Sequence, residues 1–255
     1  MAITHLLLDI EGTTCPVSFV AEVLFPYARQ RLASYLAEHW DEPAVAALVE
    51  DVREAWRADS HPQAQALLAQ AQRAPGGLGP TGSASAVVPY LEWLIDHDIK
   101  ATPLKDLQGR IWKAGYADGE IVAPLFEDVP AALRSWHAQG LVLAVYSSGS
   151  VPAQQLLYGH SQAGDLCNLF SHWFDTRCGT KQEPDSYRAI VNAMDCAAEE
   201  VLFISDALAE LHAADQAGLT VLFSDRPGNP GRDSGPFERI SDYSQIRLPD
   251  AAHRP

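Results

Sequence analysis

The sequence has few positively charged residues. Its 255 residues include 18 Lys and Arg against 33 Asp and Glu, which gives a formal net charge of −15 at pH 7. Proteins that bind nucleic acid or an anionic membrane surface need clustered Lys and Arg to contact the phosphates. The composition therefore argues against nucleic-acid and membrane partners. Any phosphate-bearing substrate would need a local source of positive charge.

Cysteine is also scarce. The four cysteines, Cys15, Cys167, Cys178 and Cys196, form no C-x-x-C pair and are widely scattered, so neither a zinc site nor a disulfide framework is predicted. The N-terminus lacks the basic-then-apolar pattern of a signal peptide, and no apolar run is long enough to cross a membrane. We expect a cytoplasmic protein with reduced thiols and no membrane anchor.

What the sequence does contain is typical of a packed α/β enzyme. Hydrophobic residues make up 47% and charged residues 20% of the chain, which are ordinary values for a globular protein. Short apolar runs bounded by turn residues predict buried strands, and amphipathic helices alternate with the later runs. The predicted strands are Leu6 to Leu8, Leu141 to Tyr146, Ser171 to Phe174, Val201 to Ile204 and Leu219 to Phe223. This alternation predicts a parallel, Rossmann-like sheet.

A long helical stretch interrupts that alternation. From Ser18 to Trp40 the pattern predicts a helix in two pieces, with Pro26 beginning the second, because proline favours the first turn of a helix. Helical spacing continues to a break expected at Gly115, apart from a Gly-, Pro- and Ser-rich loop at 74–85. We therefore predict a core domain formed by 1–18 and 122–255, and an inserted all-helical cap domain at 19–121.

Two carboxylates follow the first predicted strand. Asp9 and Glu11 are separated by one residue, and Gly12 then allows the chain to turn. Both side chains can face the polar edge of the sheet at the carboxyl end of the strand. The following residues include no basic partner, and two acids without a countercharge indicate a cation site or an acid/base role.

Other polar residues follow the later strands. Ser147 and Ser148 follow one, Lys181 lies in a loop after the next, and Asp206 follows another with Glu210 one helical turn later. Each alone is explained more simply as a turn, a helix cap or a solvated surface residue. Because the carboxyl ends of parallel strands meet at one edge of the sheet, we expect them to form one site.

A chemical role can be assigned to each of these side chains. Asp9 can attack phosphorus to form an aspartyl-phosphate that water then cleaves, while Asp9 and Asp206 together can hold Mg²⁺. Glu11 can protonate the leaving oxygen and then deprotonate the attacking water. Phosphoryl oxygens can be bound by the donors of the serine loop and by the ammonium of Lys181.

The same pattern resembles that of the haloacid dehalogenase-like superfamily. That family has D-x-[D/E]-G-T on the first strand, then a Ser or Thr, a Lys and an acidic fourth motif, with Asp more common than Glu at the second acid. The resemblance is stronger to one branch, the enolase-phosphatases of methionine salvage. It rests on DIEGTTCPVSFVAEVLFPYA from Asp9, VYSSGSVPAQQLLYGHS from Val145, FDTRCGTKQEPDSYRAI from Phe174 and RPGNPG from Arg226.

The resemblance implies a bifunctional enzyme with one Mg²⁺ per subunit. Such an enzyme enolises 2,3-diketo-5-methylthiopentyl-1-phosphate and removes the phosphate to give the acireductone. Carried onto this sequence, Asp9 and Glu11 are catalytic residues and, with Asp206, metal ligands. The substrate-binding residues are Ser147, Ser148 and Lys181. A monomer with a closing cap is implied, and the sequence assigns no base to the enolisation step.

Three alternatives keep the same fold. The first is a cap-bearing phosphatase of another small phosphorylated metabolite without enolase activity. The second is a dehalogenase in which Asp9 attacks a carbon–halogen bond, although the additional acid Asp206 argues against it. The third is a non-catalytic interaction protein, which the complete set of motif residues makes less favourable.

Overall fold

The computed structural model describes residues 2–74, 77 and 84–248, and the chain divides into two compact units. One unit comprises residues 1–20 and 121–255, and the other comprises residues 21–120. The insertion predicted at 19–121 begins two residues before and ends one residue after that second unit. The roles of the units as catalytic core and cap are predictions that their separation does not test.

The first unit is built on a six-stranded sheet with the order β3-β2-β1-β4-β5-β6. Each neighbouring pair of strands runs parallel, which confirms the predicted sheet. The strands are β1 (His5–Leu8), β2 (Val142–Tyr146), β3 (Phe170–Phe174), β4 (Val201–Ser205), β5 (Thr220–Ser224) and β6 (Arg239–Ile240). Strand β6 was not predicted from the sequence, because a strand of two residues carries no detectable alternation.

Strand β1 lies at the centre of the sheet, between β2 and β4. Leu8 is level with Val145 on one side and with Ile204 on the other. Leu6, Leu7 and Leu8 are fully buried, as expected of a parallel strand that helices cover on both faces. The carboxyl ends of β1, β2 and β4 therefore meet where the strand order reverses, which is where ligands bind in such sheets.

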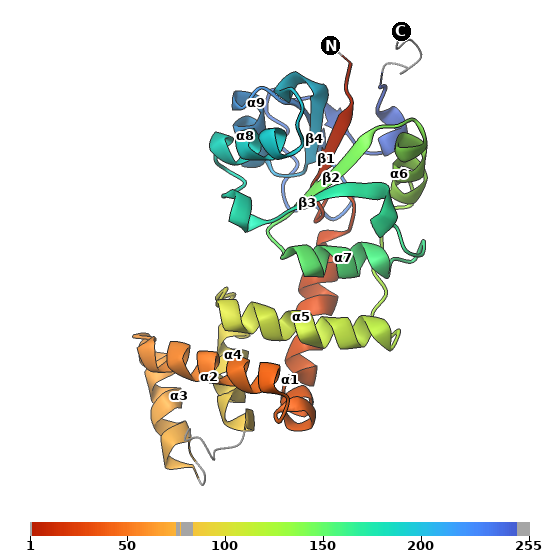
Figure 1. Cartoon of the computed structure of the whole chain (residues 1–255). Coiled ribbons are helices and arrows are strands. Elements are labelled where there is room, and N and C mark those ends of the chain that lie inside the picture. The colour runs from red at the N-terminus through yellow and green to blue at the C-terminus, as the bar shows by residue number, and fades with distance from the viewer. Residues whose placement is uncertain (1, 75–76, 78–83, 249–255) are drawn as a thin grey trace. The chain divides into compact units, whose positions relative to one another are not determined.

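Helices of the first unit flank this sheet. They are α6 (Val129–Ala138), α7 (Val151–Gly159), α8 (Pro184–Ala193) and α9 (Leu208–Gln216). Figure 1 shows α8 and α9 together on one side of the strands and α6 on the other. Side chains of α8 and α9, including Tyr187, Ile190 and Leu211, pack with Leu7 and Phe203 into one buried cluster. This packing fixes the position of α9 along the direction of the strands, and so its distance from the end of β4.

The second unit contains helices and no strand in its described residues, 21–74, 77 and 84–120. A π-helical segment, Phe19–Leu24, continues directly into the first helix, and this division into two pieces confirms the prediction. The helices are α1 (Phe25–His39), α2 (Pro43–Ala58), α3 (Pro62–Arg73), α4 (Val88–Asp96) and α5 (Thr102–Ala117). They enclose a core of their own, in which the rings of Trp56 and Tyr90 stack 4.9 Å apart.

One boundary predicted for this unit is wrong. Helix α5 continues through Gly115 to Ala117 rather than ending at the glycine. A Cβ on Gly115 would lie 2.6 Å from the ring of Tyr27, so the glycine serves close helix packing instead of a chain break. The loop predicted at 74–85 lies outside the described residues except at 74, 77, 84 and 85. Within the described residues, no helix is long and apolar enough to span a membrane.

Candidate active site

The candidate site begins at the end of β1. The backbone N–H of Asp9 continues the ladder by donating to the carbonyl of Ile204 at 3.0 Å. The Asp9 side chain leaves the strand there, and its Oδ1 accepts a hydrogen bond from the N–H of Ile10 at 2.8 Å. Asp9 is only 6% exposed. A carboxylate in this position needs a charged partner, because burial disfavours an unpaired charge.

Lys181 supplies that partner. Its Nζ lies 2.6 Å from Oδ1 of Asp9 and 2.6 Å from Oε2 of Glu210. The side chains of Asp9, Lys181 and Glu210 are 9%, 9% and 15% exposed, respectively. The local sequence around Asp9 contains no basic residue, but the fold brings one from 172 positions away in a different loop. Lys181 therefore places a positive charge beside Asp9 and Glu210 at the end of β1.

The charges of this cluster shift one another's protonation. Burial alone lowers the pKa of Lys181, but the charges of Asp9 and Glu210 outweigh it and hold that pKa above its ordinary value. Burial and the charge of Asp9 raise the pKa of Glu210 to about 7. Burial, Asp9 and Glu210 raise the pKa of Asp206 to about 7. A single ammonium among these acids leaves an excess of negative potential, which favours a bound cation.

Ser205, which follows the predicted strand Val201 to Ile204, is also a member of this cluster, although the sequence assigns it no role. It is the last residue of β4 and is fully buried. Its hydroxyl lies 2.8 Å from Oε2 of Glu210 and 3.3 Å from Oδ2 of Asp9, and it accepts from the N–H of Ala207 at 3.1 Å. The single hydroxyl proton favours the shorter contact with Glu210. The available signal was a polar residue ending an otherwise aliphatic strand.

Asp206 lies against the turn that follows Asp9. Gly12 has a φ of +68°, and a Cβ placed on it would lie 2.1 Å from Oδ2 of Asp206. Only glycine therefore lets the backbone of this turn approach the carboxylate so closely. Glu11 is half-buried in the same turn, which closes through a bridge between Glu11 and Cys15. The metal ligands predicted from sequence thus come from one turn and the adjacent strand end.

The serine loop is held in place by a glutamine. The N–H of Ser147 donates to the carbonyl of Phe174 at 3.2 Å, which ties the end of β2 to that of β3. Nε2 of Gln154 donates to the carbonyls of Gly149 and Phe174, each at 2.8 Å. Ser147 is buried and Ser148 is exposed. Gln154 was missed because its role depends on the fold of α7 against this loop.

The residues present are suitable for Mg²⁺. No group of three or more His, Cys, Asp or Glu forms a metal cage among the described residues. Mg²⁺ does not require one, because it binds one or two carboxylates and keeps water or phosphate oxygens at its other positions. The buried Asp9 and the half-buried Asp206, with Gly12 leaving space beside Asp206, match that donor set.

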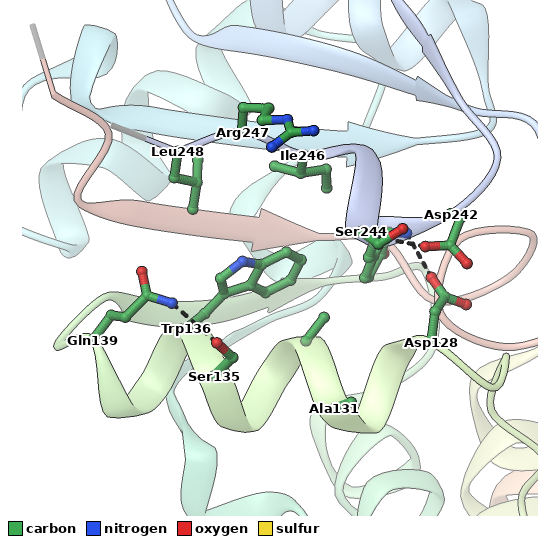
Figure 2. A pocket seen from close by; sticks show the side chains of 12 residues that line it. Asp128, Ala131, Ser135, Trp136, Gln139, Asp242, Ser244, Ile246, Arg247 and Leu248 are labelled. Carbon is green, nitrogen blue, oxygen red and sulfur yellow. Dashed lines mark hydrogen bonds between the residues drawn. The ribbon is translucent and has the colours of Figure 1, made fainter. Parts of the chain in front are cut away.

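A separate cavity of about 650 Å³ lies elsewhere in the first unit. Residues of α6 and of the segment from Asp242 to Leu248 line it, as Figure 2 shows. Its acid Asp128 is already paired with Arg226 at 2.8 Å and accepts from the N–H of Tyr243 at 2.7 Å. None of the predicted site residues lines this cavity, so its chemistry is distinct from that at the end of β1.

The fold and these strand-end residues define a class of enzyme. The family model of haloacid dehalogenase-like hydrolases matches residues 3–218. The chain therefore belongs to the haloacid dehalogenase-like hydrolases.

Close relatives narrow that class. The chain is 47% identical to enolase-phosphatase E1 of Synechococcus sp. (strain CC9902) over 230 residues, covering 89% of this chain and 91% of the relative. It is 47% identical to enolase-phosphatase E1 of Prochlorococcus marinus (strain MIT 9313) over 240 residues, covering 94% and 96%. Within the hydrolases, the chain is thus a member of the enolase-phosphatase E1 family.

Solved structures share the fold of this chain. The UTR4 protein of Saccharomyces cerevisiae superposes with a TM-score of 0.69 at 31% identity, covering 96% of this chain and all of that chain. CbbY from Rhodobacter sphaeroides, in a complex with phosphate, gives a TM-score of 0.56 at 17% identity, covering 95% and 96%. The second likeness shows the shared fold only.

Proposed function

We propose that this protein is a bifunctional, Mg²⁺-dependent enolase-phosphatase of methionine salvage. It converts 2,3-diketo-5-methylthiopentyl-1-phosphate to the acireductone and phosphate. The observation that carries the proposal is the buried Asp9 carboxylate, held 2.6 Å from Lys181 at the end of β1, in a chain of the E1 family. Asp9 and Glu11 are the catalytic residues, and the helical insertion has the role of a cap domain.

Phosphate removal proceeds through Asp9. A carboxylate oxygen of Asp9 attacks phosphorus, the bond from phosphorus to the substrate oxygen breaks, and Glu11 protonates that oxygen. Water then attacks the aspartyl-phosphate and transfers a proton to Glu11, which frees phosphate and restores Asp9. Lys181, Ser147 and Ser148 bind the phosphoryl oxygens. When bound by Asp9, Glu11 and Asp206, one Mg²⁺ supplies charge neutralisation for the anionic nucleophile and phosphate.

Glu210 holds Lys181 rather than meeting the substrate. Its Oε2 is 2.6 Å from Lys181 Nζ and 2.8 Å from Ser205 Oγ, so both side chains are fixed by the same carboxylate oxygen. An ammonium between two acids keeps its proton, because the pKa of Lys181 is held above its ordinary value. Lys181 therefore acts as a permanent cation toward the phosphate and not as a base.

The direct test follows both half-reactions at once. The protein is mixed with the diketone phosphate and Mg²⁺, and enol absorbance and phosphate release are recorded together. We expect an enol to form and phosphate to follow. Phosphate release without any enol would indicate a phosphatase of another metabolite, and full activity in EDTA would indicate a metal-free, dehalogenase-type reaction. A protein inert toward all phosphate esters would contradict an enzymatic function.

The nucleophile is tested by Asp9→Asn. We expect loss of phosphate release with the fold intact, because an amide cannot form the acyl phosphate. The matched control is Asp215→Asn, since Asp215 is exposed on α9 of the same unit. Normal turnover by Asp9→Asn, with circular dichroism unchanged in both variants, would refute this assignment.

Glu11→Asp tests whether the longer acid matters to enolisation. Most relatives in the wider superfamily have Asp at this position, and the additional methylene moves the carboxyl group outward. We expect Glu11→Asp to slow enol formation more than phosphate release from a preformed aspartyl-phosphate. Unchanged rates of both steps would refute a role of the longer side chain in enolisation.

We also propose that the protein is a monomer in solution, as expected for the family. Light scattering on the same sample tests this.

A further inference from the structure

The loop after β5 sends one buried side chain toward the candidate metal site. Asn229 is 9% exposed, and its Nδ2 donates to the carbonyls of Gly12 at 2.9 Å and Ser224 at 3.1 Å. Both carbonyls can only accept, so the amide orientation is determined by these two bonds. Oδ1 of Asn229 must therefore point to the opposite side of the side chain.

That oxygen is buried without a hydrogen-bond partner among the described residues. Buried acceptors in native proteins are almost always satisfied by protein, water or an ion. Oδ1 lies 2.8 Å from the place where a Cβ on Gly12 would be, and Oδ2 of Asp206 lies 2.1 Å from the same place. Two oxygen acceptors thus face the same small space, and neither can donate to the other when Asp206 is ionised.

The sequence around Asn229 is built to hold it there. It lies in the RPGNPG segment, whose Gly228 has a φ of +88° that few other residues adopt. Oγ of Ser224 also donates to the carbonyl of Gly12, at 3.0 Å. The Gly12 carbonyl therefore accepts hydrogen bonds from both Ser224 and Asn229, which joins the end of β5 to the turn after β1. None of the proposed catalytic steps uses this segment.

We propose that Asn229 is a positioning residue of the metal site, whose Oδ1 accepts a hydrogen bond from a water on the cation held by Asp9 and Asp206. This inference rests on the Mg²⁺ dependence in the proposed function. Mg²⁺ retains several of its waters in protein sites, and those waters are donors. Acceptors that orient the outer shell of a metal typically change its affinity by 10- to 100-fold.

The test measures Mg²⁺ affinity rather than turnover. Isothermal titration calorimetry with MgCl₂ is carried out on the wild type, Asn229→Ala, Asn229→Asp and a control, Asn192→Ala. Asn192 is exposed on α8. We expect about a tenfold or greater loss of affinity in Asn229→Ala and wild-type affinity in the control. Asn229→Asp should bind Mg²⁺ at least as tightly as the wild type, because a carboxylate oxygen keeps the acceptor.

Thermal melting in EDTA separates this role from a purely structural one. Both Asn229 variants lose the Nδ2 donor and should melt earlier than the wild type without metal, whereas only Asn229→Asp should recover with Mg²⁺. Wild-type affinity in Asn229→Ala would overturn the inference. So would equally weak binding in both variants, since that result would assign the effect to the Nδ2 bonds. A wild type that binds no Mg²⁺ would instead contradict the metal dependence of the proposed function.

Discussion

Removing the charge of Lys181 should destabilise the first unit. The main cause should be the two carboxylates left without a cation, and not lost packing. Lys181→Met keeps a side chain of similar length but leaves the carboxylates of Asp9 and Glu210 buried without their shared cation. Each now lies 2.6 Å from the ammonium and is at least 85% buried by side-chain exposure. A neighbouring acid, Asp206, adds to the repulsion.

The size of the effect follows from the burial of the pair. Breaking a buried ion pair by removing one partner typically costs about 3–5 kcal/mol, because the remaining charge is uncompensated. For a domain of this size that loss lowers the melting midpoint by roughly 6–20 °C. Changing Glu210 to Gln in the same chain removes one of the two uncompensated charges. We therefore expect the double variant, Lys181→Met with Glu210→Gln, to be more stable than Lys181→Met alone.

The pH dependence has a definite sign. The pKa of Glu210 is raised to about 7 from an ordinary value of 4.5, and loss of the ammonium raises it further. A carboxyl group whose pKa is raised by folding stabilises the fold below its unfolded pKa and loses that contribution as the pH rises through the folded pKa. The loss in free energy of unfolding that Lys181→Met causes, relative to the wild type, should therefore be small below pH 4.5 and grow as the pH rises past 7.

Differential scanning calorimetry in EDTA, on the wild type and each variant across this pH range, is the assay. Lys105→Met is the matched control, because Lys105 is exposed on α5. This variant should have the same melting temperature as the wild type. The explanation would be refuted if Lys181→Met had the same melting temperature as the wild type above pH 7. It would also fail if the double variant were less stable than the single one.

Further predictions concern the loop, the turn and a thiol. Gln154→Leu should weaken binding of inorganic phosphate in calorimetry, because the carbonyl of Gly149 loses its donor, and should cost about 1–3 kcal/mol of stability. Gly12→Ala should reduce Mg²⁺ affinity about tenfold or more, because the new Cβ displaces Asp206 from the site. Cys15, whose pKa burial raises to about 12, should react with a disulfide reagent at pH 8 only after unfolding, since its thiolate fraction falls about a thousandfold.

Each of these predictions has a matched comparison. Gln155→Leu alters an exposed neighbour on α7 and should leave phosphate binding unchanged. Gly231→Ala should keep Mg²⁺ affinity, because no atom lies within 4 Å of its added Cβ. Cys178 is only half-buried and should be labelled before Cys15. Equal effects in a variant and its comparison, or early labelling of Cys15, would contradict the corresponding prediction.

Local patterns in the sequence determined the strands and the polar residues that follow them. Runs such as Leu6 to Leu8 need no distant partner to be recognised, since burial on both faces requires a continuous apolar segment. The position of Asp9 directly after such a run places it at the edge of a parallel sheet. The two-piece helix divided near Pro26 was predictable for the same reason, because proline acts on its own turn.

Only the tertiary structure decided which side chains meet. The register of β1 against β4 brings Ser205 to Asp9, and the packing of α8 and α9 brings Glu210 to Lys181. Asn229 reaches Gly12 across 217 positions of sequence. Sequence periodicity does not predict such contacts, because they depend on the register of the strands and the positions of the helices. Both are determined by the packing of the whole core. The acids and the presence of Lys181 in their site were therefore predictable from the sequence, but the ion pairs of Lys181 with Asp9 and Glu210 and the buried amide of Asn229 were not.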